Sequence, residues 1–297
     1  MKIVGIRTSG TDRVDAAVLE GDTVRVLTDL QTFWSAPTEF TNPEAGSGVS
    51  LPLSEVELVP PVLSSARVIC IGLNYRAHVT EGSYRNDKLP PHPTLFARWT
   101  QSLTVGGTPV PVPANEDGLD WEGEIAAYIG APLVDADAET ARKSVIGYST
   151  FNDLTSRKAQ KLTSQWILGK NGDNSGPLGP VVTADEVGDL RDGLQVQTRV
   201  NGTTVQNGNT RDMIYDLGET LSLISQTFTL NPGDIICTGT PEGVGYARTP
   251  QWLLQPGDVV EVEVERLGVL SSPIVANDFR HGGTQSRTVP AGTASKP

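Results

Sequence analysis

The sequence is poor in cysteine, and this scarcity limits the kind of protein it can be. Only two cysteines occur in 297 residues, Cys70 and Cys237. A small secreted fold held together by disulfides needs more of them, so that class of protein is excluded. Both cysteines lie inside apolar runs, which favours buried free thiols, although the sequence alone leaves a disulfide between them open.

Basic residues and long apolar runs are also scarce. Lys and Arg total 23 against 35 Asp and Glu, which gives a formal net charge of -12. The basic residues are dispersed, whereas phosphate binding needs them clustered, so we expect no nucleic-acid partner. No apolar run is long enough to cross a bilayer, and residues 2–7 enter a predicted strand without a signal-peptide core. We therefore expect a cytoplasmic protein with no membrane partner.

Glycine and proline, by contrast, are frequent, with 31 and 21 residues. Together with many Val and Thr residues they favour short strands and tight turns, so we predict a mainly β fold. A loop or linker rich in Pro, Gly and Ser is expected over residues 36–54. Before it, alternating apolar and polar residues predict a small meander with strands over 2–7, 14–19 and 23–28.

These patterns divide the chain into three parts. We predict a small N-terminal β domain with its linker over residues 1–63, a larger domain over 64–281 and a tail over 282–297. The tail is short of large apolar residues and is predicted to be disordered. Within the larger domain the patterns predict strands over 68–73, 94–99, 145–151 and 259–264, a hairpin over 194–205 and helices over 74–82 and 213–228.

Two carboxylates one residue apart, Glu122 and Glu124, stand where an apolar, strand-like run begins. Alternate residues of a strand point the same way, so both side chains would share one face. Like charges held together repel each other, and a divalent cation lets both stay ionised. With no Cys or His nearby, oxygen ligands favour Mg2+ or Mn2+, and Asp153 is a natural third ligand. The alternative is a solvated acidic surface, which is common in so acidic a chain.

His78 and Glu81 lie three residues apart, in the segment predicted as a short helix. One helical turn would stack them on one face within hydrogen-bonding reach. A carboxylate beside an imidazole raises its basicity and fixes its tautomer, as a base that activates water requires. The alternative is an ordinary His-Glu pair on the surface.

Further residues suit the binding of a small acid. Lys170 lies between two glycines, which permit an anion to approach closely. Arg157 and Gln160 would share one side of a helix that starts near Asp153. Segment 238–245 is rich in glycine and hydroxyl groups and follows an apolar strand, which also suits an anion. Plain turns and a solvated helix face are the alternatives.

Taken together, these motifs resemble the fumarylacetoacetate hydrolase family in their order and rough spacing. The resemblance covers about residues 65–275 and implies a mainly β fold of the α+β class, a mixed β-roll of layered sheets with few short helices, in a homodimer. The extra N-terminal meander is similar to the small domain of many bacterial members. The resemblance rests on Asp120-Trp121-Glu122-Gly123-Glu124, on 152–157, on Gly169-Lys170 with Asp173 and 177–180, and on 238–245.

The resemblance also implies roles for individual residues. Three carboxylates would bind Mg2+ or Mn2+, and a His-Glu dyad on a mobile lid, together with a lysine, would serve catalysis. A second group of residues, which includes that lysine, would contact the 2-oxo acid end of a small substrate. In this sequence these are Glu122, Glu124 and Asp153 for the metal, His78, Glu81 and Lys170 for catalysis, and Arg157, Gln160, Lys170, Thr240 and Arg98 for the substrate.

Two positions depart from the family pattern. Arg98 stands where many members have Lys, which keeps the charge but changes the shape of the side chain. Lys158 stands where Asp is common, which reverses a charge near the predicted site. Both departures bear on the identity of the substrate more than on the metal.

The function implied is hydrolysis of a carbon-carbon bond in a 2,4-dioxo acid of the acylpyruvate type. The reaction would pass through a metal-stabilised pyruvate enolate, with His78 and Glu81 activating a water molecule. Three alternatives stay open. They are decarboxylation of oxaloacetate through the same enolate, an isomerase or hydratase acting on 2-oxo acids, and a protein that binds a metal and a 2-oxo acid without catalysis.

Overall fold

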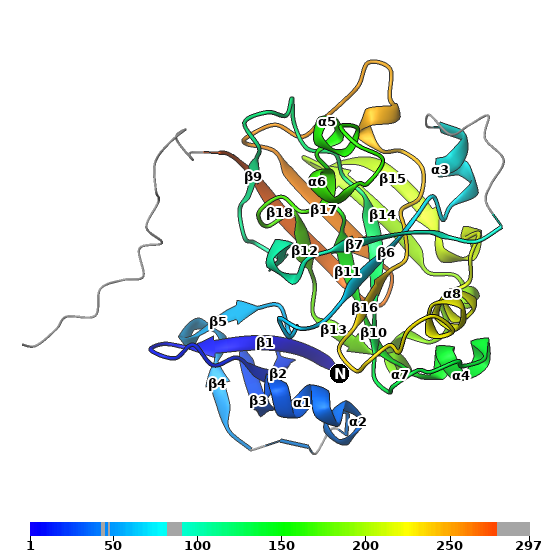
Figure 1. Cartoon of the computed structure of the whole chain (residues 1–297). Helices are drawn as coiled ribbons and strands as arrows, with labels where there is room; N and C mark the ends of the chain where they lie inside the picture. The colour runs from blue at the N-terminus through cyan, green and yellow to red at the C-terminus, as the bar shows by residue number, and fades with distance from the viewer. Residues whose placement is uncertain (43–44, 47, 82–90, 278–297) are drawn as a thin grey trace, which may run out of the picture.

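The computed structural model describes residues 1–297 apart from 43–44, 47, 82–90 and 278–297 (Figure 1). The predicted tail over 282–297 and most of the predicted lid, around residues 78–92, lie outside the described residues. Among the described helices none is both long enough and apolar enough to span a membrane.

Two sheets form the molecule, and the larger contains thirteen of the described strands. Its main path runs β4-β3-β2-β1-β13-β11-β10-β16-β6-β7, with β5, β8 and β12 attached beside it. The bounds are β1 Lys2–Thr8, β2 Asp15–Glu20, β3 Thr23–Asp29, β4 Ser50–Pro52, β5 Val56–Val59, β6 Val68–Gly72, β7 Thr94–Arg98, β8 Leu103–Val105, β10 Gly123–Ile129, β11 Val145–Asn152, β12 Gly176–Leu178, β13 Val181–Thr183 and β16 Ile235–Cys237.

The smaller sheet contains five described strands in the order β15-β14-β17-β18-β9. Its hairpin turns at Asn201 and Gly202, both with positive φ, as the Asn-Gly pair predicts. The bounds are β9 Val110–Val112, β14 Gln195–Val200, β15 Thr203–Asn209, β17 Val259–Val264 and β18 Gly268–Ala276.

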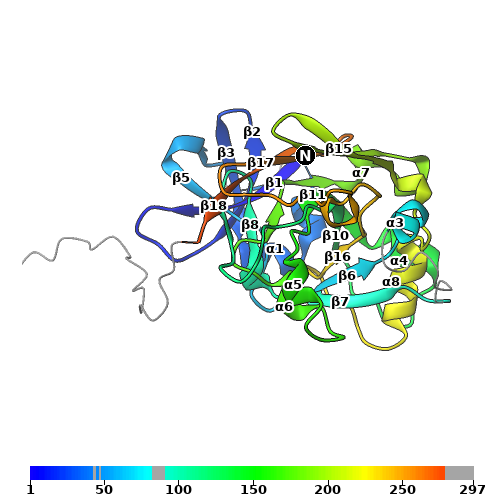
Figure 2. The same cartoon turned by 90° about the horizontal axis from the view of Figure 1, so that it is seen from above.

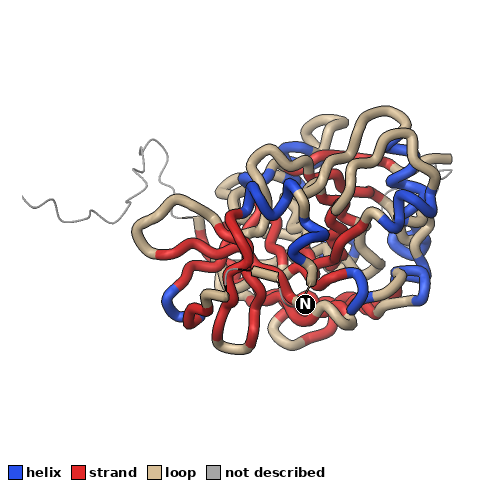
Figure 3. Tube along the Cα trace, turned by 90° about the horizontal axis from the view of Figure 1, so that it is seen from below, coloured by secondary structure: helices blue, strands red, loops and turns tan. Residues whose placement is uncertain are grey.

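The described helices are short and lie around the sheets, whose strands run through the middle of the molecule (Figure 3). The helices α5 and α6 pack side by side, next to β7 (Figure 2). The predicted mainly β fold is confirmed. The bounds are α1 Leu30–Ser35, α2 Pro37–Phe40, α3 Arg76–Glu81, α4 Ala138–Lys143, α5 Arg157–Gln160, α6 Ile167–Lys170, α7 Ala184–Val187 and α8 Leu217–Ser225, with 3-10 turns η1 Leu53–Glu55, η2 Thr100–Ser102, η3 Leu190–Asp192, η4 Thr210–Asp212 and η5 Gly245–Ala247.

Two sequence predictions of local structure need correction. The helix predicted over 213–228 spans only α8, because the side chain of Asp216 caps its first turn by accepting from the Glu219 N–H at 3.1 Å. Met213 instead forms a β-bridge with Tyr75. The loop predicted over 36–54 contains the short helix α2 and the strand β4.

The N-terminal strands are hydrogen-bonded into the large sheet. Strand β1 pairs with β13, with Lys2 opposite Val182. Trp34 of α1 stacks on Tyr128 of β10, with ring centroids 6.0 Å apart. The large sheet and its hydrophobic core both continue across the predicted domain boundary between residues 63 and 64. The boundary itself stays a prediction.

Strand β10 positions the candidate site, because both of its faces are buried. Ile125 and Ala127 pack into one hydrophobic cluster, whereas Ala126 and Tyr128 pack into another on the opposite face. Where β10 begins and β11 ends, the N–H of Asp153 donates to the carbonyl of Glu122 at 2.9 Å. The rigid centre of the sheet therefore holds this end of both strands in place.

Candidate active site

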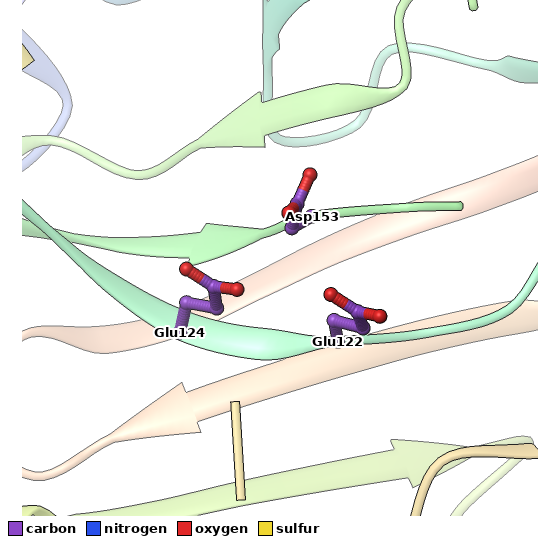
Figure 4. A group of neighbouring side chains, drawn as sticks. All are labelled: Glu122, Glu124 and Asp153. Atoms are coloured by element: carbon purple, nitrogen blue, oxygen red, sulfur yellow. The ribbon is translucent and has the colours of Figure 1, made fainter. Parts of the chain in front are cut away.

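The three predicted metal ligands lie together where β10 begins and the antiparallel β11 ends. Glu122 and Glu124 point to one face, and Asp153 faces them from the neighbouring strand (Figure 4). One carboxylate oxygen of each residue lies within 4.8 Å of one from both others. All three side chains are buried, which rules out the alternative of a solvated acidic surface.

Two of these carboxylates are neutralised by buried cations. The ammonium of Lys170 lies 2.6 Å from Glu122 and 2.7 Å from Asp153, and Arg157 lies 2.7 Å from Glu122. Burial alone would raise the pKa of Glu122, but Lys170 and then Arg157 outweigh it and lower this pKa to about 2. Glu122 is therefore ionised at neutral pH.

Glu124 differs, because none of the described basic residues forms an ion pair with it. Its carboxylate accepts from the N–H of Gly239 at 3.0 Å. Burial first, then repulsion by Asp153 and Glu122, raises the pKa of Glu124 well above its ordinary value. A buried carboxylate set with one uncompensated member fits a hard divalent cation, which would favour the ionised form of Glu124.

Lys170 is buried at the end of α6, where Asp153 and Glu122 outweigh burial and raise its pKa. The glycine before it is required by close packing. A Cβ on Gly169 would lie 2.5 Å from the Cβ of Gln160, so only glycine lets α6 approach α5 this closely.

Arg157, on α5, is held by a residue to which the sequence analysis assigned no role. Both oxygens of Asp120 are used: Oδ2 accepts from Arg157 Nε at 2.8 Å, and Oδ1 accepts from the N–H of Gly245 at 2.6 Å. The Arg157 guanidinium also donates to Gln160 at 3.0 Å. The signal for Asp120 was its place at the start of the Asp-Trp-Glu-Gly-Glu motif.

Most of these groups line one cavity of about 500 Å³, whereas Asp120 and Asp153 lie behind its wall and do not line it. Phe96 and Trp166 contribute aromatic rings to its wall, with centroids 5.3 Å apart. No sequence motif pointed to these two rings. The predicted residues that line the cavity are His78, Glu122, Glu124, Arg157, Gln160, Lys170 and Thr240.

The predicted dyad forms within the described residues. On α3, Nδ1 of His78 lies 2.7 Å from Oε1 of Glu81, and the second oxygen of Glu81 accepts from the Gly243 N–H at 2.7 Å. Glu81 therefore orients the imidazole and ties α3 to the loop that follows Thr240. The pair is partly buried, and His78 lines the cavity.

The geometry argues against the predicted substrate contact of Arg98, and we correct its role. Its side chain is fully buried and does not line the cavity. Nε donates to Asp153 at 2.5 Å, and the other nitrogens donate to Ser102, to Ser175 and to the carbonyl of Leu154. Arg98 therefore positions Asp153, a candidate metal ligand, without lining the cavity itself.

The other departure from the family pattern also lies away from the cavity. Lys158 is exposed on the outer side of α5 and pairs with Asp117 at 2.5 Å. The two cysteines face each other on the parallel strands β6 and β16, where burial raises the pKa of both thiols. Cys70 and Cys237 are free and buried, which confirms the favoured interpretation.

Comparison with known proteins shows the family. The model of the fumarylacetoacetate (FAA) hydrolase C-terminal family matches residues 67–275, so the chain belongs to this family, as the motifs predicted.

Individual relatives have several activities. The chain is 39% identical over 237 residues to the oxaloacetate tautomerase YisK of Bacillus subtilis, covering 78% of this chain and 77% of that protein. The structure of 5-carboxymethyl-2-hydroxymuconate delta-isomerase from Mycobacterium smegmatis is similar, with a TM-score of 0.76, 33% identity and coverage of 93% and 100% of the two chains. Fumarylpyruvate hydrolase from Pseudomonas aeruginosa, in complex with Mn2+ and pyruvate, has a TM-score of 0.65, 30% identity and coverage of 74% and 92%.

Proposed function

We propose that this protein is an enzyme that moves a proton between carbon and oxygen in a 2-oxo acid, interconverting its keto and enol forms with the help of a divalent cation. The observation that carries the proposal is that His78 of the dyad lines the same cavity as Glu122 and Glu124 of the buried carboxylate cluster. A base and a charge-stabilising centre that face the same space are what such a reaction needs.

Glu122, Glu124 and Asp153 would hold Mg2+ or Mn2+, as their oxygen-only donor set and the uncompensated charge of Glu124 favour. When bound, the ion would supply Lewis-acid stabilisation for the negative charge of the 2-oxo acid and its enol form. Support comes also from the similar fumarylpyruvate hydrolase, whose structure contains Mn2+ and pyruvate.

Side chains of the protein would transfer the proton, bind the substrate and exclude water. His78 would take the proton from C3 and return it to oxygen, while Glu81 keeps the imidazole oriented. Arg157, Lys170 and Thr240 line the cavity as donors for the carboxylate and oxo groups of the substrate. The aromatic wall of Phe96 and Trp166 would exclude water from the reacting carbon.

A second candidate is hydrolysis of an acylpyruvate, in which His78 would deprotonate a water molecule that attacks the 4-carbonyl. The preformed dyad suits this chemistry equally well, and fumarylpyruvate hydrolase is similar in structure. Four relatives that are 37–39% identical over 225–237 residues are oxaloacetate tautomerases, so we place proton transfer first.

Two assays with Mn2+ test the proposal: the decay of the enol absorbance of oxaloacetate, and the release of pyruvate from acylpyruvates. His78→Ala should slow the active reaction by about 10²- to 10⁴-fold, the usual contribution of a general base. His92→Ala is the matched control, because His92 is exposed and lines a different cavity. Full activity of His78→Ala would overturn the role of the dyad, and pyruvate release without tautomerisation would favour the second candidate.

A further inference from the structure

Lys161, directly after α5, is a cation of the cavity to which no motif assigned a role. Its side chain lines the same cavity as the carboxylate cluster, and it is exposed to solvent. The ammonium lies over the ring of Tyr246, 3.6 Å from the centroid. It also donates to the hydroxyl of Tyr246. None of the carboxylates in the described part of the chain forms an ion pair with it, so no protein carboxylate neutralises its charge.

Among the described residues, three other cations lie near the cluster, and each is already paired with protein carboxylates. Arg98 pairs with Asp153, Arg157 with Asp120 and Glu122, and Lys170 with Glu122 and Asp153. One substrate carboxylate can be matched at the metal end of the cavity. A second one would find no unpaired cation among these three, and Lys161 would supply it.

Tyr246 sets where this charge lies. The same ring is approached by Arg157, whose Cζ lies 6.0 Å from the centroid, and Arg157 contacts Glu122. The N–H of Tyr246 donates to Asp120 at 3.1 Å, so the ring is anchored to the buried part of the site. Lys161 and Arg157 therefore both contact the ring of Tyr246, and Arg157 in turn contacts Glu122 of the carboxylate cluster.

We propose that Lys161 binds a second carboxylate, at the end of the substrate remote from the 2-oxo acid group. The enzyme then selects dicarboxylic 2-oxo acids over monocarboxylic ones of the same length. This inference rests on the proposed function for the orientation of the substrate, with its 2-oxo acid end at the carboxylate cluster. It adds the class of substrate, and it names Lys161 as the residue that recognises the second carboxylate.

The test compares two ligands that differ only at the remote end, oxaloacetate and 2-oxobutanoate, in which a methyl group replaces the carboxylate. Binding of each to the Mn2+-loaded full-length protein is measured by isothermal titration calorimetry. The unmodified protein should prefer oxaloacetate, and Lys161→Gln should reduce that preference about five- to tenfold, as expected for one partly exposed charge-assisted hydrogen bond. Affinity for 2-oxobutanoate should not change.

Lys158→Gln is the matched control. Lys158 belongs to the same segment, is also exposed, and pairs with Asp117 away from the cavity. It should leave the preference unchanged. An unmodified protein without preference for oxaloacetate, or an equal loss in both lysine variants, would overturn the inference. Because the readout is binding, it stands apart from the proposed reaction, whose failure would appear as absent turnover in the enol and pyruvate assays.

Discussion

At the scale of single residues, Arg98 shows how a charge-conserving difference changes the function of a position. Its guanidinium makes buried contacts with Asp153, Ser102 and Ser175, and with the carbonyl of Leu154. The compact ammonium of a lysine cannot make all of these contacts from the same place. The charge of this side chain can be read from the sequence, but all of its partners except Ser102 are more than 50 residues away and could not be predicted.

We expect Arg98→Lys to lower the free energy of unfolding by about 2 kcal/mol, because buried partners lose their hydrogen bonds. The dissociation constant for Mn2+ should rise about tenfold, as is typical when a group that orients a metal ligand is changed. Denaturant unfolding and Mn2+ titration measure the two effects. Arg13→Lys, at an exposed pair with Asp15, should change stability by less than about 0.5 kcal/mol. Unchanged Mn2+ affinity in Arg98→Lys would contradict the positioning role.

Glu124 provides a prediction with a defined pH dependence. Without metal, burial and the repulsion of Asp153 and Glu122 raise the folded-state pKa of Glu124 above its unfolded value. The folded state therefore binds more protons than the unfolded state between these two pKa values, and stability falls as the pH rises through that window. Bound Mn2+ should reverse the loss, adding about 2.7 kcal/mol at a concentration one hundred times its dissociation constant.

Glu124→Gln should remove both effects. The variant should be at least as stable as the unmodified protein at pH 8 without metal, because no carboxylate has to ionise at this buried position. Its melting temperature should no longer rise on addition of Mn2+. Thermal unfolding at pH 5 and pH 8, with and without Mn2+, measures this. A Mn2+ response equal to that of the unmodified protein would remove Glu124 from the ligand set.

At the scale of elements, periodicity predicted where strands lie better than where helices end. The alternation over 23–28 and 259–264 predicted β3 and β17 because the side-chain period of a strand is local. The helix predicted over 213–228 was too long: Ile214 lies before the capping residue Asp216, and Phe228 lies beyond the end of α8 and is exposed. Tertiary contacts decide such ends, and the sequence pattern does not contain them.

The short helix α3 depends on Glu81 for its place. This side chain joins His78 to the N–H of Gly243 and so links two segments that are 162 residues apart. Glu81→Ala should lower kcat about a hundredfold, the lower end of what a misplaced general base costs. Amide hydrogen exchange over residues 76–81 should also accelerate, because the helix loses its anchor.

Thr80→Ala is the control for α3. The Thr80 hydroxyl donates to the carbonyl of Ala77 on the exposed side of the same helix. This variant should leave both kcat and exchange nearly unchanged. If Glu81→Ala reduced kcat while exchange over 76–81 stayed slow, the anchoring role would be wrong and Glu81 would act on His78 alone.

At the scale of the whole molecule, the sequence predicted the ordered motifs but not how the first strands join the rest. The candidate ligands could be predicted because neighbours in one strand stand close together in the sequence. The pairing of Lys2 with Val182, by contrast, joins residues 180 positions apart, and an alternating pattern does not specify a strand's partner. The predicted boundary after residue 63 followed composition, whereas the sheet continues across it.

This continuity leads to a prediction about the N-terminal segment. Phe33 and Trp34 of α1 belong to the same buried cluster as Tyr128 of β10 and Phe151 of β11, the strands that carry the metal cluster. Deleting residues 1–63 would expose that face of the central sheet to water. The net stability of a domain is only about 5–15 kcal/mol, so the remainder should not fold as a soluble, cooperative unit.

Tryptophan fluorescence and far-UV circular dichroism of the full chain should report one coincident unfolding transition. Deleting residues 282–297, the predicted disordered tail, is the control and should leave that transition in place. A remainder over 64–297 that folds and binds Mn2+ as tightly as the full chain would instead support two independent domains.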